Sequence, residues 1–280
     1  MTGRLFVFGL GFSGLEIARA AMAAGWPVAG CVTTAEKAAL LRRGGIDTVA
    51  FGEAAEKAGA ATHLLVSIPP GDSGDPALAA CERLRPAWVG YLSTTGVYGD
   101  RGGGWVDETD TPQPGQARSR NRLAAEQGWQ AWGARQGVPV HIFRLPAIYG
   151  PGRSALDQVC EGRAQRIDKP GQVFSRIHVA DLAQTVLASM AHGGLGTIFN
   201  VTDDDPAPQA DVIALACELL GVPPPPLVPY DEAAQRMSAM ARSFYAENRR
   251  VRNDRIKREL GVVLKYPSYR EGLRAIRERE

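Results

Sequence analysis

The feature that most constrains this chain is a glycine-rich turn between a short apolar run and a helical stretch. Leu5-Phe6-Val7-Phe8 is a run of apolar residues, which is typical of a strand buried on both faces of a sheet. The run leads directly into Gly9-Leu10-Gly11-Phe12-Ser13-Gly14, and residues 15–24 then have a helical composition that ends at Gly25. A strand, a G-x-G-x-x-G turn and a helix in this order predict a dinucleotide-binding unit.

The residues of this turn have separate expected roles. Gly9 permits the tight turn, Gly11 lets a pyrophosphate approach the backbone, and Gly14 lets the helix pack on the strand. Phe12 and Ser13 lie in the same turn, and we expect them among the cofactor-binding residues, since a helix N-terminus offers free N–H groups to phosphates. The alternative is a glycine-rich turn that binds no ligand, which the flanking strand and helix disfavour.

Short apolar runs and helical segments continue to alternate after this unit. The further predicted strands are residues 27–32, 48–51, 63–68 and 88–93, and the predicted helices between them are residues 35–43, 53–58 and 76–84. This alternation predicts an α/β fold with a Rossmann-type, doubly wound parallel sheet. Ligands of such sheets bind at the carboxyl ends of the strands, so the residues just after each strand are the candidate site.

The residues after the second strand bear on the choice between NAD and NADP. An Asp or Glu at this place would bind the ribose hydroxyls of NAD, whereas this chain has Thr33, Thr34 and, slightly later, Lys37. Two hydroxyls and an ammonium group suit the 2′-phosphate of NADP, so we predict NADP as the cofactor, with NAD as the less favoured choice. Alternatively, Thr34 only caps its helix. Both can hold, because a capped helix N-terminus also attracts phosphate.

The composition narrows the class of protein and its partners. The chain has 280 residues, 45% of them apolar and 22% charged, which is ordinary for a soluble globular protein. Its 32 basic residues nearly balance 30 acidic ones, so nothing points to nucleic acid. We expect no membrane span and no export signal. The four scattered cysteines suggest neither disulfides nor a metal site, so we expect a cytoplasmic protein.

A family resemblance begins at the end of the fifth predicted strand. Ser93-Thr94-Thr95-Gly96-Val97-Tyr98-Gly99 resembles the S-[ST]-x-x-V-Y-G segment of the extended short-chain dehydrogenases/reductases, the group of nucleotide-sugar epimerases and dehydratases. Further stretches that are similar to this family, in the same order, are residues 106–112, 144–152, 177–183, 199–201 and 256–261. The resemblance implies a Rossmann core over residues 1–150, completed by about 173–202, and a smaller substrate lobe from 151–172 and 203–280. We expect lobe helices at roughly 208–220, 231–243, 253–260 and 269–278.

The same resemblance implies roles for residues at the ends of the strands. Thr94 stands where the family keeps its catalytic Ser/Thr, which hydrogen-bonds the reacting oxygen beside the cofactor. Ser67, Ile68 and Pro69 would flank the ribose of the cofactor. Pro146, Ala147 and Ile148 would lie along its nicotinamide. His178 is more simply explained as a residue at a helix start than as a catalyst.

The chain departs from the family at its general acid/base. The family uses the Tyr of Y-x-x-x-K, with the Lys lowering the Tyr pKa and holding the cofactor ribose. Here the family's frame places Arg118 at the Tyr position and Arg122 at the Lys position. A guanidinium stays protonated, so Arg118 cannot act as a base, but it can bind a carboxylate or phosphate. Arg122 can keep the charge and the ribose contact. Tyr98 and Tyr149 are displaced candidates for proton transfer, although each is more simply structural.

Residues four apart lie on one face of a helix, so Arg118 and Arg122 can point together into a cleft. The alternative is a solvated basic helix face. Three functions therefore stay open. The first is an NADP-dependent oxidoreductase, epimerase or dehydratase for an anionic or nucleotide-linked small molecule, and the second is a catalytically weakened NADP(H)-binding sensor or regulatory protein. The third is a metabolic enzyme with altered chemistry, which uses the cofactor without the Tyr. A homodimer is left open.

Overall fold

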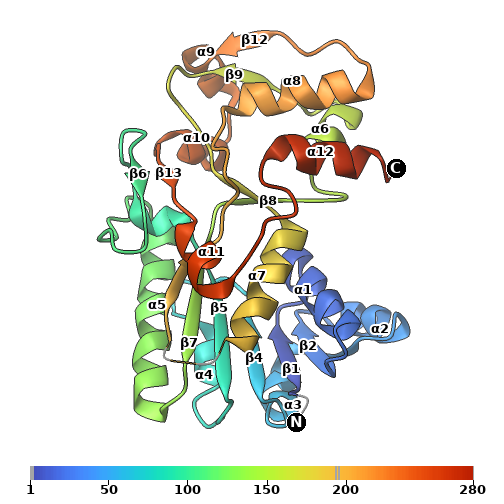
Figure 1. Cartoon of the computed structure of the whole chain (residues 1–280), viewed down its shortest axis with the longest axis vertical. Helices are drawn as coiled ribbons and strands as arrows, with labels where there is room; N and C mark the ends of the chain where they lie inside the picture. Colours follow the sequence, from blue (N-terminus) through green and yellow to red (C-terminus); the bar gives the residue numbers. More distant parts are fainter. Residues whose placement is uncertain (1–2, 193, 195, 280) are drawn as a thin grey trace.

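A sheet of parallel strands forms the centre of the computed structural model, which describes residues 3–192, 194 and 196–279 (Figure 1). Its strands are β1 (Leu5–Phe8), β2 (Val28–Val32), β3 (Asp47–Ala50), β4 (His63–Val66), β5 (Trp88–Thr94), β7 (Val140–Leu145) and β11 (Ile198–Asn200). Their order is β11-β7-β5-β4-β1-β2-β3, and every neighbouring pair is parallel. The Rossmann-type α/β prediction is confirmed. The strand order reverses between β1 and β4, where such sheets open a ligand crevice.

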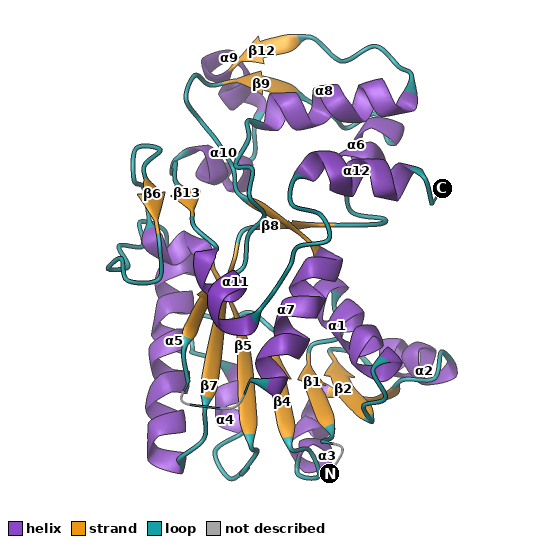
Figure 2. Cartoon of the chain, in the orientation of Figure 1, coloured by secondary structure: helices purple, strands orange, loops and turns teal. Residues whose placement is uncertain are grey.

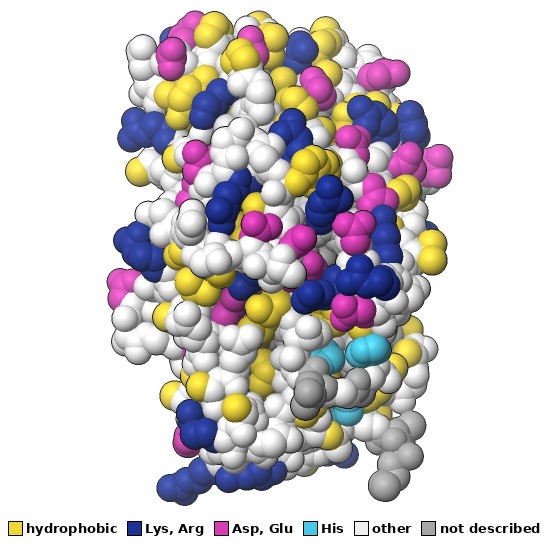
Figure 3. Space-filling model, turned by 60° about the vertical axis from the view of Figure 1, so that its left-hand side comes forward, with side chains coloured by type: hydrophobic (Ala, Val, Ile, Leu, Met, Phe, Trp, Pro, Cys, Tyr) yellow, Lys and Arg dark blue, Asp and Glu magenta, His cyan; other side chains and the backbone are white. Residues whose placement is uncertain are grey.

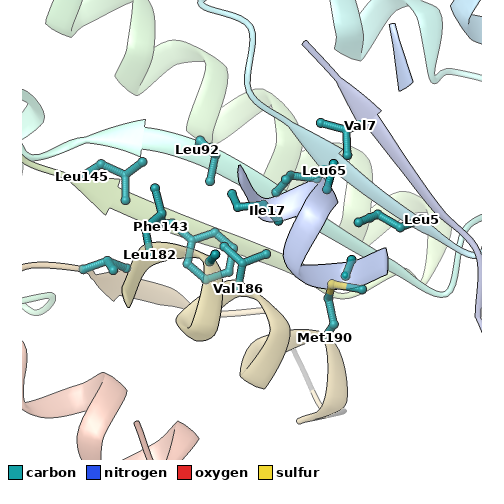
Figure 4. Close-up of a cluster of buried hydrophobic side chains, with 14 of the residues drawn as sticks. Leu5, Val7, Ile17, Leu65, Leu92, Phe143, Leu145, Leu182, Val186 and Met190 are labelled. Carbon is teal, nitrogen blue, oxygen red and sulfur yellow. The ribbon is translucent and has the colours of Figure 1, made fainter. Parts of the chain in front are cut away.

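Helices cover both faces of this sheet (Figure 2). The helices on one face are α1 (Phe12–Ala23), α2 (Ala35–Arg43), α7 (Val179–Ala191) and α11 (Asp254–Leu260), and those on the other are α3 (Ala54–Ala58), α4 (Pro76–Ala80) and α5 (Ala117–Gln136). Along β1, Leu5 and Val7 belong to the apolar cluster with α1 and α7 (Figure 4), whereas Phe6 and Phe8 belong to the cluster with α5. Alternate residues thus serve opposite faces, which explains the continuous apolar run.

Two short 3₁₀ segments follow strands of the sheet, η1 (Phe51–Glu53) after β3 and η2 (Thr95–Tyr98) after β5. Because η1 occupies the start of the predicted 53–58 helix, α3 begins only at Ala54. The predicted 76–84 helix also ends early, since α4 stops at Ala80 and residues 81–83 form turns.

A second group of elements lies beyond the carboxyl ends of the strands, at the top of Figure 1. Its helices are α6 (Ala155–Cys160), α8 (Gln209–Leu220), α9 (Tyr230–Arg236), α10 (Ala239–Tyr245) and α12 (Tyr269–Arg277), and its strands β9 (Arg166–Asp168) and β12 (Leu227–Pro229) pair in parallel. The single helix predicted over 231–243 is wrong. Met237 is extended (φ −74°, ψ 143°), and Ser238 starts a new helix by accepting a hydrogen bond from the Ala241 N–H (3.1 Å).

Two short strand pairs connect the sheet to this second group. They are β8 (Ala147–Tyr149) with β10 (Arg176–His178), and β6 (Trp105–Val106) with β13 (Arg250–Val251). The division into a core and a lobe at about residues 150, 172 and 202 stays a prediction. Within the described ranges, no helix has both the length and the apolarity that a membrane crossing requires.

Candidate functional site

The glycine turn has the geometry that a bound pyrophosphate needs. Gly9 has a φ of +98°, and a Cβ there would lie 2.6 Å from Ile68 Cγ2. A Cβ on Gly14 would lie 2.2 Å from the Gly9 carbonyl oxygen, so helix α1 approaches the turn too closely for any side chain. A Cβ on Gly11, in contrast, would have no described atom within 4 Å. The turn is therefore closed around Gly9 and Gly14 and open at Gly11, which is the face a phosphate would approach.

The first turn of α1 is also free for an anion. Gly11 is its N-cap residue and gives no side-chain cap, and no acidic residue stands in this turn. Ser13 is half-buried there, and the Phe12 ring lies under the Arg153 guanidinium, with 5.2 Å between the guanidinium carbon and the ring centroid. The free N–H groups and the helix dipole therefore face an approaching phosphate without competition.

The residues that follow β2 are compatible with both NAD and NADP and do not distinguish between the two cofactors. Thr34 caps α2, because its Oγ1 accepts a hydrogen bond from the Lys37 N–H (3.3 Å). Thr33 and Lys37 are exposed beside it. The Glu36 carboxylate stands in the same turn, where its own backbone N–H and then the Thr34 hydroxyl lower its pKa. Our sequence interpretation gave this carboxylate no role, although it could accept hydrogen bonds from a ribose.

The residues after β4 and β7 lie at the neighbouring carboxyl ends of the sheet. The Ser67 N–H donates to the Phe8 carbonyl (2.8 Å), which holds the start of this loop against β1. Pro69, Pro146 and Ala147 line a cavity of about 350 Å³, which we call the small compartment. A second cavity of about 720 Å³, the large compartment, is lined by Ile148 and elements of the second group. Both compartments are lined by Thr94, Arg122, Pro146, Ala147 and Phe244, so they are parts of one cleft.

Thr94, the last residue of β5, lies where the two compartments meet. Its Oγ1 accepts a hydrogen bond from the Gly96 N–H (3.1 Å). Since the backbone group is the donor, the hydroxyl hydrogen of Thr94 remains available to donate to a bound molecule.

Arg118 and Arg122 lie one turn apart on α5, and both line the small compartment. Arg122 is held against the sheet, because its Nη1 donates to the Leu92 carbonyl (2.7 Å) and to the Tyr91 hydroxyl (3.3 Å). Arg118 is exposed, with its guanidinium carbon 4.4 Å from the centroid of the Phe244 ring on α10. The two charges thus share one face of the helix, one fixed and one at the rim.

Neither of the two candidate tyrosines is placed for proton transfer in the small compartment. The Tyr98 hydroxyl is buried and donates to Asn200 Oδ1 (2.8 Å), and burial raises its pKa. Tyr149 lines the large compartment, but its hydroxyl donates to the Ser268 carbonyl (3.3 Å). Burial and then the nearby Asp203 carboxylate raise the Tyr149 pKa. Both hydroxyls already donate to distant parts of the chain, which favours a structural role for each.

A buried polar network beneath Thr94 accounts for several of the family-like motifs. The Glu126 carboxylate pairs with Arg144 Nη2 (2.8 Å), with side-chain exposures of 2% and 3%, and it accepts a hydrogen bond from Ser93 Oγ. The Arg144 guanidinium carbon lies 4.8 Å from the Tyr98 ring centroid. Asn200 extends the network, since its N–H donates to Glu108 Oε1 (2.8 Å). These motif residues hold β5, β7, β11 and α5 together rather than contact a ligand.

His178 is likewise structural, at the N-cap of α7. Its Nδ1 accepts a hydrogen bond from the Ala180 N–H (3.1 Å), and its ring packs against Tyr149 and Tyr266. Burial, followed by the charges of Arg279 and Lys265, lowers its pKa to about 4.

We therefore expect His178 to make stability depend on pH. Its native pKa lies below the ordinary value of about 6.5, so between pH 6.5 and pH 4 the unfolded state binds a proton that the native state does not. The free energy of unfolding should fall by about 2 kcal/mol from pH 7 to pH 5 through this residue. Urea titrations at both pH values should show a smaller fall in the free energy of unfolding for His178→Asn, which keeps an N-cap acceptor. His192→Asn, at the exposed end of the same helix, is the control, and its free energy of unfolding should change with pH as that of the wild type does.

Glu247 is a residue of the small compartment that the sequence interpretation missed. Its Oε2 accepts from Arg249 Nη1 (2.8 Å), and its buried Oε1 has no hydrogen-bond partner among the described residues. The sequence showed only a basic run at 248–252, and no local pattern marks the carboxylate before it. Metal ligands do not gather in the described part of the chain, which holds no cluster of three or more His, Cys, Asp or Glu side chains suited to an ion.

Comparison with known proteins agrees with the observed fold. The model of the NAD dependent epimerase/dehydratase family matches residues 74–202. A solved structure of a functionally unknown conserved protein from Silicibacter pomeroyi DSS is 48% identical, with a TM-score of 0.93 over 99% of both chains. UDP-glucuronic acid 4-epimerase from Bacillus cereus, solved with NAD, has a TM-score of 0.77 at 16% identity, over 98% of this chain and 96% of that one, and shows the fold alone.

A curated relative with a named activity is the 3-diazoavenalumate denitrifying reductase of a Streptomyces species. It is 29% identical over 170 residues, which are 59% of this chain and 55% of the reductase. The chain therefore spans little more than half the length of that enzyme. With the family model, the parallel sheet and the glycine turn in agreement, this chain is similar to the NAD-dependent epimerase/dehydratase family over residues 74–202.

Proposed function

We propose that this protein is an NADP(H)-dependent reductase of a small organic anion, and that it works without a tyrosine acid. The observation that carries the proposal is the lining of the small compartment. Thr94, Arg118 and Arg122 line it together, and no tyrosine does so among the described residues. The compartment thus offers a hydroxyl donor and two positive charges where the family keeps a phenol.

The residues present fit a dinucleotide. Gly9, Gly11 and Gly14 would receive its pyrophosphate, and Thr33, Thr34 and Lys37 are near enough to the end of β2 to receive a 2′-phosphate. Glu36 in the same turn is the feature that favours NAD instead. A bound nicotinamide supplies or accepts a hydride.

The protein's own contribution is binding and charge stabilisation. The Thr94 hydroxyl would donate a hydrogen bond to the reacting oxygen or nitrogen of the substrate. Arg122 would stabilise the negative charge that hydride transfer leaves on that atom until solvent water supplies the proton. Arg118, at the rim, binds the carboxylate or phosphate of the substrate in a forked geometry. A positioned acid or base contributes about 10²–10⁴-fold to proton transfer. Without one, ordinary alcohol–ketone exchange on nucleotide sugars should be poor. The reductase named among the relatives supports reduction rather than epimerisation as the reaction type.

Arg118→Ala tests the anion site. The assay follows NADPH oxidation with a panel of reducible carboxylates and phosphates as substrates. The KM of the variant for a substrate should be about 10–100-fold higher than that of the wild type, because a hydrogen-bonded charge pair is lost. Its affinity for NADPH should stay unchanged. Arg120→Ala is the matched control, since Arg120 lies on the same helix outside the cleft and donates to the Gly115 carbonyl (2.8 Å).

The outcomes separate the competing functions. Tighter binding of NADH than of NADPH in fluorescence titrations would overturn the NADP preference. Sound cofactor binding with no oxidation of NADPH by any member of the panel would favour a sensor or regulatory protein. Brisk turnover of nucleotide sugars with a pH profile near neutrality would contradict a tyrosine-free reductase.

A further inference from the structure

The small compartment contains a second hydroxyl besides that of Thr94. Ser119, in the first turn of α5, lines this compartment and is 3% exposed. Its Oγ makes no hydrogen bond with the described residues. The oxygen is not enclosed by protein, in contrast to the unpaired Oγ of Ser175, so it keeps accessible surface. Because Ser119 lies on the buried face of the helix, this surface belongs to the cavity, and the hydroxyl is open to a molecule bound there.

The Ser119 and Thr94 hydroxyls lie on the same side of Gly96. A Cβ on Gly96 would lie 2.8 Å from Ser119 Oγ and 3.3 Å from Thr94 Oγ1. Both distances start from one point, so the two oxygens are at most about 6 Å apart, and one atom between them can lie within hydrogen-bonding distance of both. Gly96 lines the small compartment as well, and its missing side chain leaves this space unfilled.

The surroundings of the two hydroxyls favour negative charge. Gln116, the N-cap residue of α5, makes no side-chain cap, and the first turn of the helix holds no acidic residue. The guanidinium groups of Arg118 and Arg122 line the same compartment, and the Glu247 carboxylate of the lining is paired with Arg249 Nη1 (2.8 Å). A helix N-terminus and two positive side chains therefore stabilise charge that develops on an atom held by the hydroxyls.

We propose that Ser119 is a catalytic residue, whose hydroxyl donates a hydrogen bond beside Thr94 to the reacting oxygen of the substrate. The inference rests on the proposed reductase function and narrows its substrate class. An atom that accepts from two hydroxyls needs two lone pairs, which a carbonyl oxygen has and an imine nitrogen lacks. The substrate is therefore an anionic aldehyde or ketone. Hydride addition to its carbonyl carbon moves an electron pair onto the oxygen, and both hydroxyls stabilise this charge until water supplies the proton.

Pairs of carboxylates that differ by one carbonyl test this inference on protein loaded with NADP⁺, which supports no reduction. The pairs are benzoylformate with phenylacetate, and 3- and 4-acetylbenzoate with 3- and 4-ethylbenzoate, respectively. Calorimetry measures the dissociation constants. In at least one pair, the carbonyl compound should bind the wild type about 10–30-fold more tightly than its partner, as expected for two hydrogen bonds from neutral donors.

Ser119→Ala should reduce this preference by about fivefold and leave the affinity for the carbonyl-free acid unchanged. For any of the carbonyl compounds that NADPH reduces, kcat should fall about 100-fold in the same variant. Gly96→Ala keeps both hydroxyls but places a methyl group between them, so it should also remove the preference. Ser243→Ala is the control, because Ser243 lines the same compartment but its Oγ already donates to the Met240 carbonyl (2.7 Å).

The results distinguish failure of this inference from failure of the proposed function. Equal affinities within every pair in the wild type, or an unchanged preference in Ser119→Ala, would overturn the role of Ser119 and leave the reductase proposal intact. Absence of binding by every acid to the NADP⁺-loaded wild type would overturn the anion site at Arg118 and, with it, the proposed function.

Discussion

Replacement of Glu126 by alanine should lower the free energy of unfolding by about 3–5 kcal/mol, because it leaves the buried Arg144 guanidinium without its counter-charge. The same change removes the acceptor of the Ser93 hydroxyl. Urea denaturation followed by circular dichroism will measure the loss. The effect should reach the cleft as well, since Ser93 immediately precedes Thr94.

Two further variants separate the effect of the buried charge pair on stability from the effect of lost packing. In Glu126→Leu with Arg144→Met, both charges are gone, and much of the lost stability should return, because no charge is left buried alone. Glu82→Ala removes an exposed carboxylate that faces Arg135 at 4.0 Å, and it should change stability by less than about 0.5 kcal/mol. A double variant as unstable as Glu126→Ala would show that the lost hydrogen bonds and altered packing, not the unpaired charge, dominate.

Gly11→Ala should weaken NADPH binding by about 10–100-fold without destabilising the fold. The new Cβ meets no protein atom within 4 Å, so the native structure accommodates it. It stands instead where the pyrophosphate approaches the helix N-terminus, and charge-assisted hydrogen bonds to that phosphate would be lost. Fluorescence titration of NADPH measures the affinity, and thermal unfolding of the cofactor-free protein measures the fold.

Two other glycines give the controls for this change. Gly44→Ala, at the far end of α2, meets its nearest atom at 3.4 Å and should leave both affinity and stability unchanged. Gly14→Ala places a Cβ 2.2 Å from the Gly9 carbonyl and should lower the melting temperature before any ligand is added. If Gly11→Ala bound NADPH as the wild type does, the glycine turn would not be the pyrophosphate site.

The parts of the structure that the sequence predicted best are those decided by neighbouring residues. The strand, turn and helix at Leu5–Ala23 follow from an apolar run and spaced glycines, so the pattern was sufficient. The face shared by Arg118 and Arg122 follows from helical spacing. The break between α9 and α10 escaped prediction because an ordinary methionine adopts an extended conformation there.

The chemistry of the cleft depended on contacts that no local pattern reveals. Tyr98 and Tyr149 were candidates by type, but their hydroxyls donate to residues 102 and 119 positions away. Glu247 gave no signal, because no local pattern marks a carboxylate that pairs with Arg249 and lines the small compartment. On the face shown in Figure 3, basic and acidic side chains lie interspersed, so the composition alone does not say where an anion binds.

The arrangement of α6, α8 and α12 has a consequence for how the chain is made. Leu156 of α6 packs into one apolar cluster with Val212 and Ile213 of α8 and with Leu273 and Ile276 of α12. During vectorial synthesis, α6 leaves the ribosome well before α8 and longer still before α12. Its apolar side must therefore stay exposed in an unfinished nascent chain, which gives a chaperone or a protease time to act on this short helix.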